Sequence, residues 1–145
     1  MLPELRASAT LPSPDHLTRE ECLELLAGCQ VGRMVFTVGA LPAVVPVAIA
    51  LDTGAVVCRT ASGSRLAHAA DGQVLALQAD EIDVSTRSGW SVVATGVAGV
   101  VRDGPEARRI ADLVRPWVPG HDDVGIRLPL TVVTGRRLPG RRTSP

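Results

Sequence analysis

The fold of this chain is constrained most by a series of six apolar segments, separated by turn residues such as Gly, Pro and Asp. Their many β-branched residues, and the alternation of apolar and polar positions in the first, are typical of β-strands. Six strands cannot all leave their edges exposed, and closing the sheet into a barrel protects those edges. We therefore predict a mainly β protein with short helices, a six-stranded barrel with strands at 31–38, 43–51, 55–60, 73–80, 90–103 and 124–137.

Three short helices are expected around these strands. Thr18 and Glu21 form a capping-box pattern at the start of an apolar helix over 18–28. A second helix is expected over 62–70, and Pro105 suits the first turn of a third helix before the last strand.

One domain is expected, because a chain of 145 residues buries about two-thirds of its surface on folding without a disulfide or metal. Prolines near the start and a polar end indicate chain termini with little structure of their own. We expect a flexible arm at 1–16, the barrel domain over 17–138 and a loose tail at 139–145.

Composition argues against several functional classes. A net charge of zero does not favour nucleic-acid binding, and a chain whose 15 basic residues are all Arg has no Lys for a Schiff base. No apolar run is as long as a membrane-spanning helix, which needs about 20 residues, and the N-terminal segment lacks the pattern of a secretory signal. The three cysteines, Cys22, Cys29 and Cys58, form no CxxC motif, and free thiols are typical of a protein in a reducing compartment. We expect a cytoplasmic protein that binds neither membrane nor nucleic acid.

The segment CRTASGSRLAHA at 58–69 carries the main candidate site. A strand ends in Arg59 and Thr60, a loop of small residues follows, and a helix opens with Ser64 and Arg65. Two arginines, hydroxyls and free amides at a helix start suit a phosphate dianion. Alternatively, both arginines are solvated and a serine merely caps the helix. The residues alone leave both interpretations open.

Four motifs in order make the chain similar to a known family. They are LPAVVPVAIALDTG, AVVCRTASGSRL, RSGWSVVATGVA and the closing PWVPG with VGIRLPLTVVTGRR. From about Leu17 to Arg137 the chain resembles the FMN-binding split-barrel family related to pyridoxamine 5'-phosphate oxidase, in particular its small actinobacterial members. The resemblance implies a homodimeric six-stranded split β-barrel with FMN at the subunit interface. The chain has no Tyr, which pyridoxamine oxidases proper use to hold their substrate, so oxidation of that vitamin is not implied.

The resemblance also implies roles for individual residues. Arg59, Thr60, Ser64 and Arg65, the last more often Lys in relatives, would bind the flavin phosphate. One strand would lie along the isoalloxazine ring, the backbone of the next would run beside it, and a Ser-Gly-Trp-Ser motif would reach the phosphate or the ribityl chain. The strand along the ring carries Val45, Pro46 and Val47. The backbone beside the ring is that of Val57 and Cys58, and the motif is Ser88, Gly89, Trp90 and Ser91.

Other polar and aromatic residues leave alternatives open. Trp117 is either a core residue or a lid on the flavin from the partner subunit, and the Arg136–Arg137 pair is either exposed or a cofactor contact. Ser64 and His68 lie four residues apart, but without a GxSxG motif they do not indicate a hydrolase. We expect no metal site, and the sequence identifies no catalytic residue.

The function we expect is that of an FMN-dependent oxidoreductase acting on a small organic substrate or acceptor. The flavin would perform the hydride or electron transfer. One alternative is a reductase that uses a deazaflavin in the same basic groove. Another is a non-catalytic module that stores or senses a flavin or haem.

Overall fold

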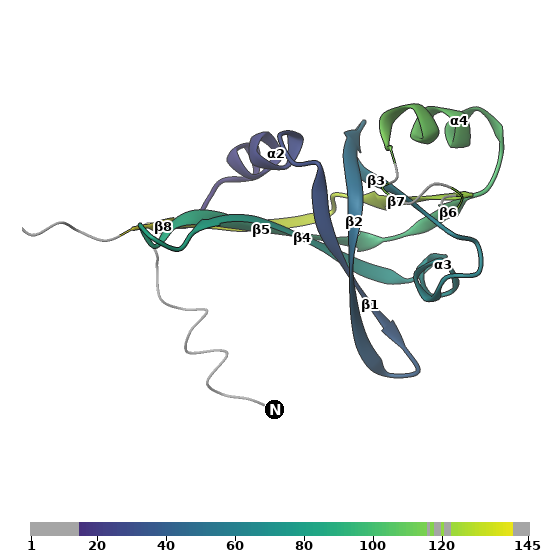
Figure 1. The fold of residues 1–145 in the computed structure, drawn as a ribbon, viewed down its shortest axis with the longest axis horizontal. Helices are drawn as coiled ribbons and strands as arrows, with labels where there is room; N and C mark the ends of the chain where they lie inside the picture. The colour runs from purple at the N-terminus through teal and green to yellow at the C-terminus, as the bar shows by residue number, and fades with distance from the viewer. Residues whose placement is uncertain (1–14, 116, 118–119, 121–122, 141–145) are drawn as a thin grey trace, which may run out of the picture.

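The computed structural model describes residues 15–115, 117, 120 and 123–140 of the chain. Its strands form one antiparallel sheet in the order β6-β7-β3-β2-β1-β4-β5-β8, and its helices are short (Figure 1). The elements are α2 (Arg19–Ala27), β1 (Val31–Val38), β2 (Leu41–Asp52), β3 (Ala55–Thr60), α3 (Arg65–Ala70), β4 (Val74–Asp83), β5 (Ser88–Val97), β6 (Gly99–Val101), α4 (Gly104–Leu113), β7 (Val124–Pro129) and β8 (Val132–Pro139).

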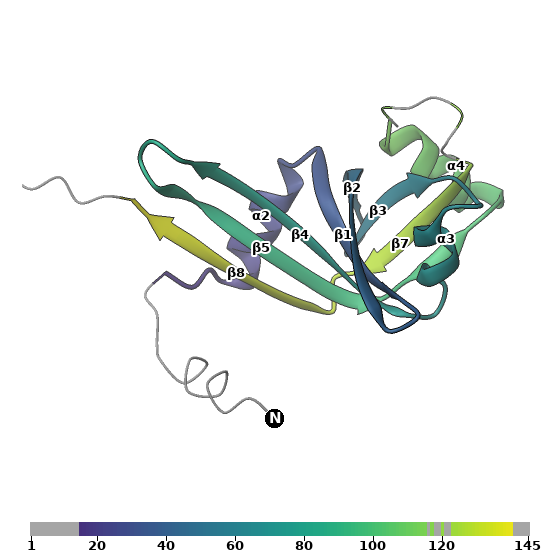
Figure 2. The same cartoon turned by 60° about the horizontal axis from the view of Figure 1, so that its bottom comes forward.

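Strand β2 belongs to both halves of this sheet. Its residues 41–48 pair with β1, and its residues 49–52 pair with β3. One half continues from β1 to β4, β5 and β8, and the other continues from β3 to β7 and β6. Figures 1 and 2 show the two halves joined through β2 and through the passages from β5 to β6 and from β7 to β8. This curled antiparallel sheet with few short helices confirms the predicted fold class.

The predicted strand count of six is wrong, because the described residues form eight strands. The segments expected as single strands at 90–103 and 124–137 are each divided in two. Between β5 and β6, Ala98 exchanges backbone hydrogen bonds of 2.8 and 2.9 Å with the turn before β4. Between β7 and β8, the N–H of Leu130 donates to the carbonyl of Gly54 at 3.0 Å. At both points the chain leaves one half of the sheet and enters the other.

The main core lies between the two halves of the sheet. Met34, Leu77 and Val92 come from one half, Val56 and Ile126 from the other, and all belong to one cluster of buried residues. Helix α2 covers one face of the β4–β5–β8 half (Figure 1). It begins at the predicted capping box, in which the backbone of Thr18 and the side chain of Glu21 bond at 2.9 Å.

A second, smaller cluster lies on the other face of β3. It joins Val57 to Ile110 and Val114, so α4 covers the face of β3 that points away from the main core. Residues 55–58 of β3 are consequently buried on both faces. Packing on two faces holds the end of this strand, where the candidate phosphate site begins, in a defined position.

The predicted arm at 1–16 and tail at 139–145 lie mostly outside the described residues. Of the arm, Asp15 and His16 lie along β8, where the N–H of Arg137 donates to the carbonyl of Asp15 at 2.7 Å. Of the tail, Pro139 still belongs to β8. None of the helices in the described part of the chain has the length and hydropathy needed to cross a bilayer.

Candidate functional site

A pocket with a volume of about 710 Å³ lies between β2 and the connection from β3 to α3. We call it the first pocket. Its lining has an apolar wall from β2, a cationic end at the β3–α3 connection and further apolar side chains from β1, α3 and the chain after α4. The lining residues are Phe36, Pro42, Ala43, Val44, Val45, Pro46, Val47, Ala48, Arg59, Thr60, Ser64, Arg65, Leu66, Val114 and Trp117.

The apolar wall exists because β2 separates from β3 over residues 42–48. This stretch pairs with β1, whereas the pairing of β2 with β3 is confined to residues 49–52. Pro42 and Pro46 lie in the separated stretch and have no N–H to donate to a further strand. Over this stretch β2 is not paired with β3, and its aliphatic side chains line the pocket.

The cationic end combines two arginines with two hydroxyls. Arg59 lies near the end of β3 and Arg65 begins α3. The hydroxyls of Thr60 and Ser64 are 2.9 Å apart, and the Ser64 hydroxyl also accepts the N–H of Ala67 at 3.0 Å. Whichever hydroxyl donates to the other, the second keeps its hydrogen for another acceptor. The pair can therefore donate one hydrogen bond to an anion beside the arginines.

Two backbone amides of this connection already have hydrogen-bond partners. The N–H of Ser62 donates to the carboxylate of Asp123 at 2.8 Å, and the N–H of Ser64 donates to the carbonyl of Ala61 at 3.0 Å. The bonds from Ser62 lower the pKa of Asp123, so its carboxylate is ionised at neutral pH. An anion in the first pocket would therefore not receive hydrogen bonds from these two amides.

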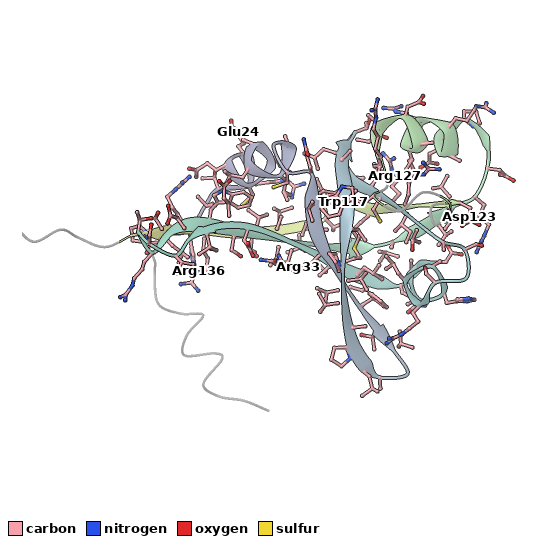
Figure 3. The ribbon with its side chains drawn as sticks, in the orientation of Figure 1. Glu24, Arg33, Trp117, Asp123, Arg127 and Arg136 are labelled. Atoms are coloured by element: carbon pink, nitrogen blue, oxygen red, sulfur yellow. The ribbon has the colours of Figure 1, made fainter. Side chains whose placement is uncertain are left out.

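Eight of the predicted site residues meet at the first pocket. They come from β2, from the β3–α3 connection and from the chain after α4. Trp117 is 72% exposed, so it lines the pocket without being a core residue (Figure 3). The eight are Val45, Pro46, Val47, Arg59, Thr60, Ser64, Arg65 and Trp117.

Val57 and Cys58 do not line this pocket. The Val57 side chain packs under α4, and that of Cys58 is fully buried in the main core. Burial raises the pKa of the Cys58 thiol to about 12, so this thiol is neutral at physiological pH. Both residues support the end of β3 from opposite faces.

The Ser-Gly-Trp-Ser motif lies elsewhere in the chain. Ser88, Trp90 and Ser91 begin β5, beside the far ends of β4 and β8, and Trp90 is buried. Arg136 pairs with Ser91 across β8. Figure 2 places this end of the sheet opposite α3 and α4, and Figure 3 shows Arg136 far from Asp123. Within one chain these residues do not reach the first pocket.

Several lining residues were not identified from the sequence. Phe36, Leu66 and Val114 look like ordinary core positions, and only the assembled sheet brings them to the pocket. The contact of Asp123 with this site was also not predicted. Asp123 comes just before the predicted last strand, and its carboxylate accepts the N–H of Ser62 in the loop after β3. The pairing of Thr60 with Val124 carries Asp123 to that loop.

Comparison with known proteins supports this assignment of the fold. The sequence model of the family described as pyridoxamine 5'-phosphate oxidase matches residues 18–137. The uncharacterized protein Rv0080 of Mycobacterium tuberculosis is 40% identical over 128 residues, which are 85% of this chain and 84% of that protein.

Two solved structures are also similar. The FAD binding protein from Mycobacterium smegmatis is 35% identical with a TM-score of 0.71, covering 86% of this chain and 98% of that one. A putative pyridoxamine 5'-phosphate oxidase from Corynebacterium glutamicum is 27% identical with a TM-score of 0.74, covering 91% and 99%.

Proposed function

The chain belongs to the pyridoxamine 5'-phosphate oxidase family, and on this premise we propose that it is a flavin-dependent oxidoreductase that binds the FMN moiety in the first pocket. The observation that carries the proposal is the union in one pocket of an aliphatic wall and a cationic, hydroxyl-bearing end. FMN has two matching parts, a flat heteroaromatic ring system with an apolar dimethylbenzene end and a phosphate. The similar mycobacterial protein that is named as FAD binding supports a flavin as the ligand.

The cationic end is the proposed phosphate site. Arg59 and Arg65 supply two positive charges, and a guanidinium can donate two hydrogen bonds to one phosphate. The Thr60–Ser64 hydroxyl pair supplies a further donor. Each hydrogen bond to a charged group is worth about 1.5–3 kcal/mol, so these groups together can hold a phosphorylated ligand.

The apolar wall is the proposed ring site. Val45 and Val47 of β2, with Phe36 and Leu66, offer aliphatic and aromatic surface to a planar heterocycle, and Trp117 adds an exposed indole. These side chains orient the ring and exclude water from it. When bound, the flavin itself supplies the hydride or electron transfer. The reaction then needs no acid or base from the lining, and among the described residues none that lines this pocket carries a carboxylate or imidazole.

Two other ligands remain alternatives to FMN. A deazaflavin would use the same phosphate site. Haem is less well supported, because the described lining of the first pocket contains no His, Cys, Met or Tyr to bind its iron. A module that binds flavin without turnover would share the pocket and differ only in reactivity.

A homodimer with the cofactor at its interface is part of the proposal. Val44, Val74, Val93, Val97 and Val132 are all at least 36% exposed. The strand register places them on one face of the β2–β1–β4–β5–β8 half, and α2 packs on the other face. This valine face reaches the first pocket at Val44.

An uncovered apolar face of this kind is typical of an interaction surface. A second copy on it would hide the valines. It could also bring the partner's Ser91, which shares this face of β5 with Val93 and Val97, towards the first pocket, which Ser91 does not reach within one chain. Trp117 would then be close to both subunits.

The phosphate site can be tested by titrating flavin fluorescence with FMN and with riboflavin, which lacks the phosphate. Arg59→Ala and Arg65→Ala should each weaken FMN binding by about tenfold or more and leave riboflavin binding nearly unchanged. Arg87→Ala, in the exposed turn between β4 and β5, is the matched control. A change of less than twofold for FMN, or an equal loss for riboflavin, contradicts the proposed site.

Catalysis is tested separately with the flavin-loaded protein. The absorption spectrum of the isolated protein should show an oxidised flavin, and NAD(P)H should bleach it. Repeated bleaching and recovery with an added electron acceptor would establish an oxidoreductase. A flavin that stays oxidised through these additions would indicate a binding module instead.

A further inference from the structure

The contact of Asp123 with the β3–α3 connection joins two segments that are far apart in the chain. Asp123 lies directly before β7, and its carboxylate accepts the N–H of Ser62 at 2.8 Å. Because Thr60 pairs with Val124 across β3 and β7, Asp123 reaches this connection from the neighbouring strand. Asp123 lines a second, smaller pocket of about 250 Å³ and does not line the first. It therefore acts on the first pocket only from outside its lining, through this connection and through its charge.

Packing does little to hold the turn over residues 61–64 that Asp123 contacts. Ser62 and Gly63 are both exposed, and a Cβ atom placed on Gly63 would have no heavy atom within 4 Å apart from its chain neighbours. Glycine also leaves the backbone more conformational freedom than any other residue. The N–H of Ser64 donates to the carbonyl of Ala61 at 3.0 Å, which closes the turn but does not attach it to another element. The bond from Ser62 to Asp123 attaches the middle of the turn to the start of β7.

The ends of the 61–64 turn carry groups of the proposed phosphate site. Thr60 precedes the turn and Ser64 ends it, and their hydroxyls are 2.9 Å apart. Arg65 follows as the first residue of α3. In a turn that moved freely, the separation of these hydroxyls and the direction of Arg65 would vary, and a phosphate would have to restrain them on binding. A turn already fixed by Asp123 avoids this entropic cost, since preorganised groups bind a ligand more tightly than mobile ones.

The charge of Asp123 acts in the opposite direction. Hydrogen bonds from Ser62 and, to a smaller extent, the charge of Arg102 lower the pKa of Asp123, so its carboxylate is negative at neutral pH. A negative group near a phosphate site repels the phosphate, although solvent screens an exposed charge. If this charge were its only influence, removing Asp123 would strengthen the binding of a phosphorylated ligand. If Asp123 holds the turn, removing it should weaken that binding.

We infer that Asp123 is a positioning residue for the phosphate end of the first pocket, where its carboxylate holds the 61–64 turn so that Thr60, Ser64 and Arg65 face one phosphate. This inference rests on the proposed function. Asp123 does not touch the ligand and acts through the N–H of Ser62. This role requires an acceptor oxygen and not a negative charge. Asn has nearly the same shape and keeps an acceptor oxygen, so it should replace Asp123, whereas Ala should not.

The test is a fluorescence titration of the wild type and its variants with FMN and with riboflavin. Asp123→Ala should weaken FMN binding about threefold to tenfold, the effect of one lost hydrogen bond, and should change riboflavin binding by less than about twofold. Asp123→Asn should bind FMN at least as tightly as the wild type, because it keeps the acceptor and removes the repulsive charge. Asp112→Ala removes an exposed carboxylate of α4 outside both pockets and should change neither affinity.

A second measurement follows the turn without a flavin. In hydrogen–deuterium exchange observed by NMR, the Ser62 amide should be protected in the wild type and in Asp123→Asn, and should exchange several times faster in Asp123→Ala. Thermal melting of each variant shows whether it is folded. Equally fast exchange in all three proteins would show that Asp123 does not hold the turn. Faster exchange in the Ala variant with unchanged FMN affinity would show that the turn does not control the phosphate site. Either result overturns the inference.

The titrations also separate this inference from the proposed function. Stronger FMN binding by Asp123→Ala, an equal loss for riboflavin, or an Asn variant as weak as the Ala variant makes the inference wrong. The proposed function stands in each of these cases if FMN binding still depends on Arg65. If the wild type binds neither FMN nor riboflavin, both fail. A selective loss of FMN affinity in the Ala variant that the Asn variant restores supports the inference.

Discussion

The carboxylate of Asp52 and the guanidinium of Arg127 form an ion pair that fastens the β2–β3 turn to β7. Asp52 Oδ2 lies 3.0 Å from Arg127 Nη1, and Arg127 Nη2 donates to the carbonyl oxygen of Asp52 at 2.9 Å. Arg109 of α4 binds the other carboxylate oxygen. Asp52 is a buried acid that connects this turn to both β7 and α4.

Asp52→Asn should destabilise the protein at neutral pH. The hydrogen bond from Arg127 lowers the pKa of Asp52 below its ordinary value. A carboxyl whose pKa is lower in the folded than in the unfolded state stabilises the fold above the unfolded pKa, about 4, and loses this effect as pH falls through the folded pKa. The melting temperature of the variant should therefore lie below that of the wild type at pH 7, and the difference should shrink below about pH 4.

Asp112→Asn on the exposed side of α4 is the matched control for this acid. It should melt like the wild type at both pH values. A difference between the Asp52 variant and the wild type that is as large at pH 3 as at pH 7 would show that lost packing, not the ion pairs, causes the destabilisation.

The three cysteines should differ in reactivity towards a thiol reagent. Burial raises the pKa of Cys58 to about 12, and it also raises those of Cys22 and Cys29. The thiolate is the reactive form, so native protein at pH 8 should react slowly. Cys29, which is only half-buried, should be modified first. Mass spectrometry after timed alkylation measures the order, and rapid labelling of Cys58 in folded protein would contradict its burial.

Val97→Asp should dissociate the proposed dimer. Val97 is 55% exposed on the valine face and pairs with Val74, which is 65% exposed. A carboxylate there must be desolvated when a second copy covers the face, and an unpaired buried charge is strongly unfavourable. Light scattering should change from twice the chain mass to the chain mass. Val84→Asp, in the turn after β4 and 84% exposed, should leave the dimer intact. A wild type that is already monomeric would refute the proposed interface.

Short-range signals in the sequence were sufficient for several local elements. The strands predicted at 31–38 and 55–60 have these bounds in the structure. The turn between β2 and β3 places Thr53 and Gly54 at φ 45° and 75°, a conformation that Gly adopts readily. The capping box formed as predicted, because its two hydrogen bonds join residues three apart.

The candidate site was predictable only in part. Arg59, Thr60, Ser64 and Arg65 are close in sequence and could be recognised together. The opposite orientations of the Val57 and Cys58 side chains could not be predicted. Strand β3 is covered on both faces, so its sequence shows no alternation of polar and apolar residues.

The sequence by itself determined the mainly β character, the helix start at Thr18 and the cluster of arginines and hydroxyls after β3, since each depends on neighbours a few residues apart. Only the tertiary structure decided that two long segments divide into four strands, that β2 separates from β3 to open the first pocket, and that Asp123 contacts the β3–α3 connection. The physical reason is that these features depend on hydrogen bonds and packing between segments far apart in the chain, such as the bond from Leu130 to Gly54. Local propensity carries no information about such partners.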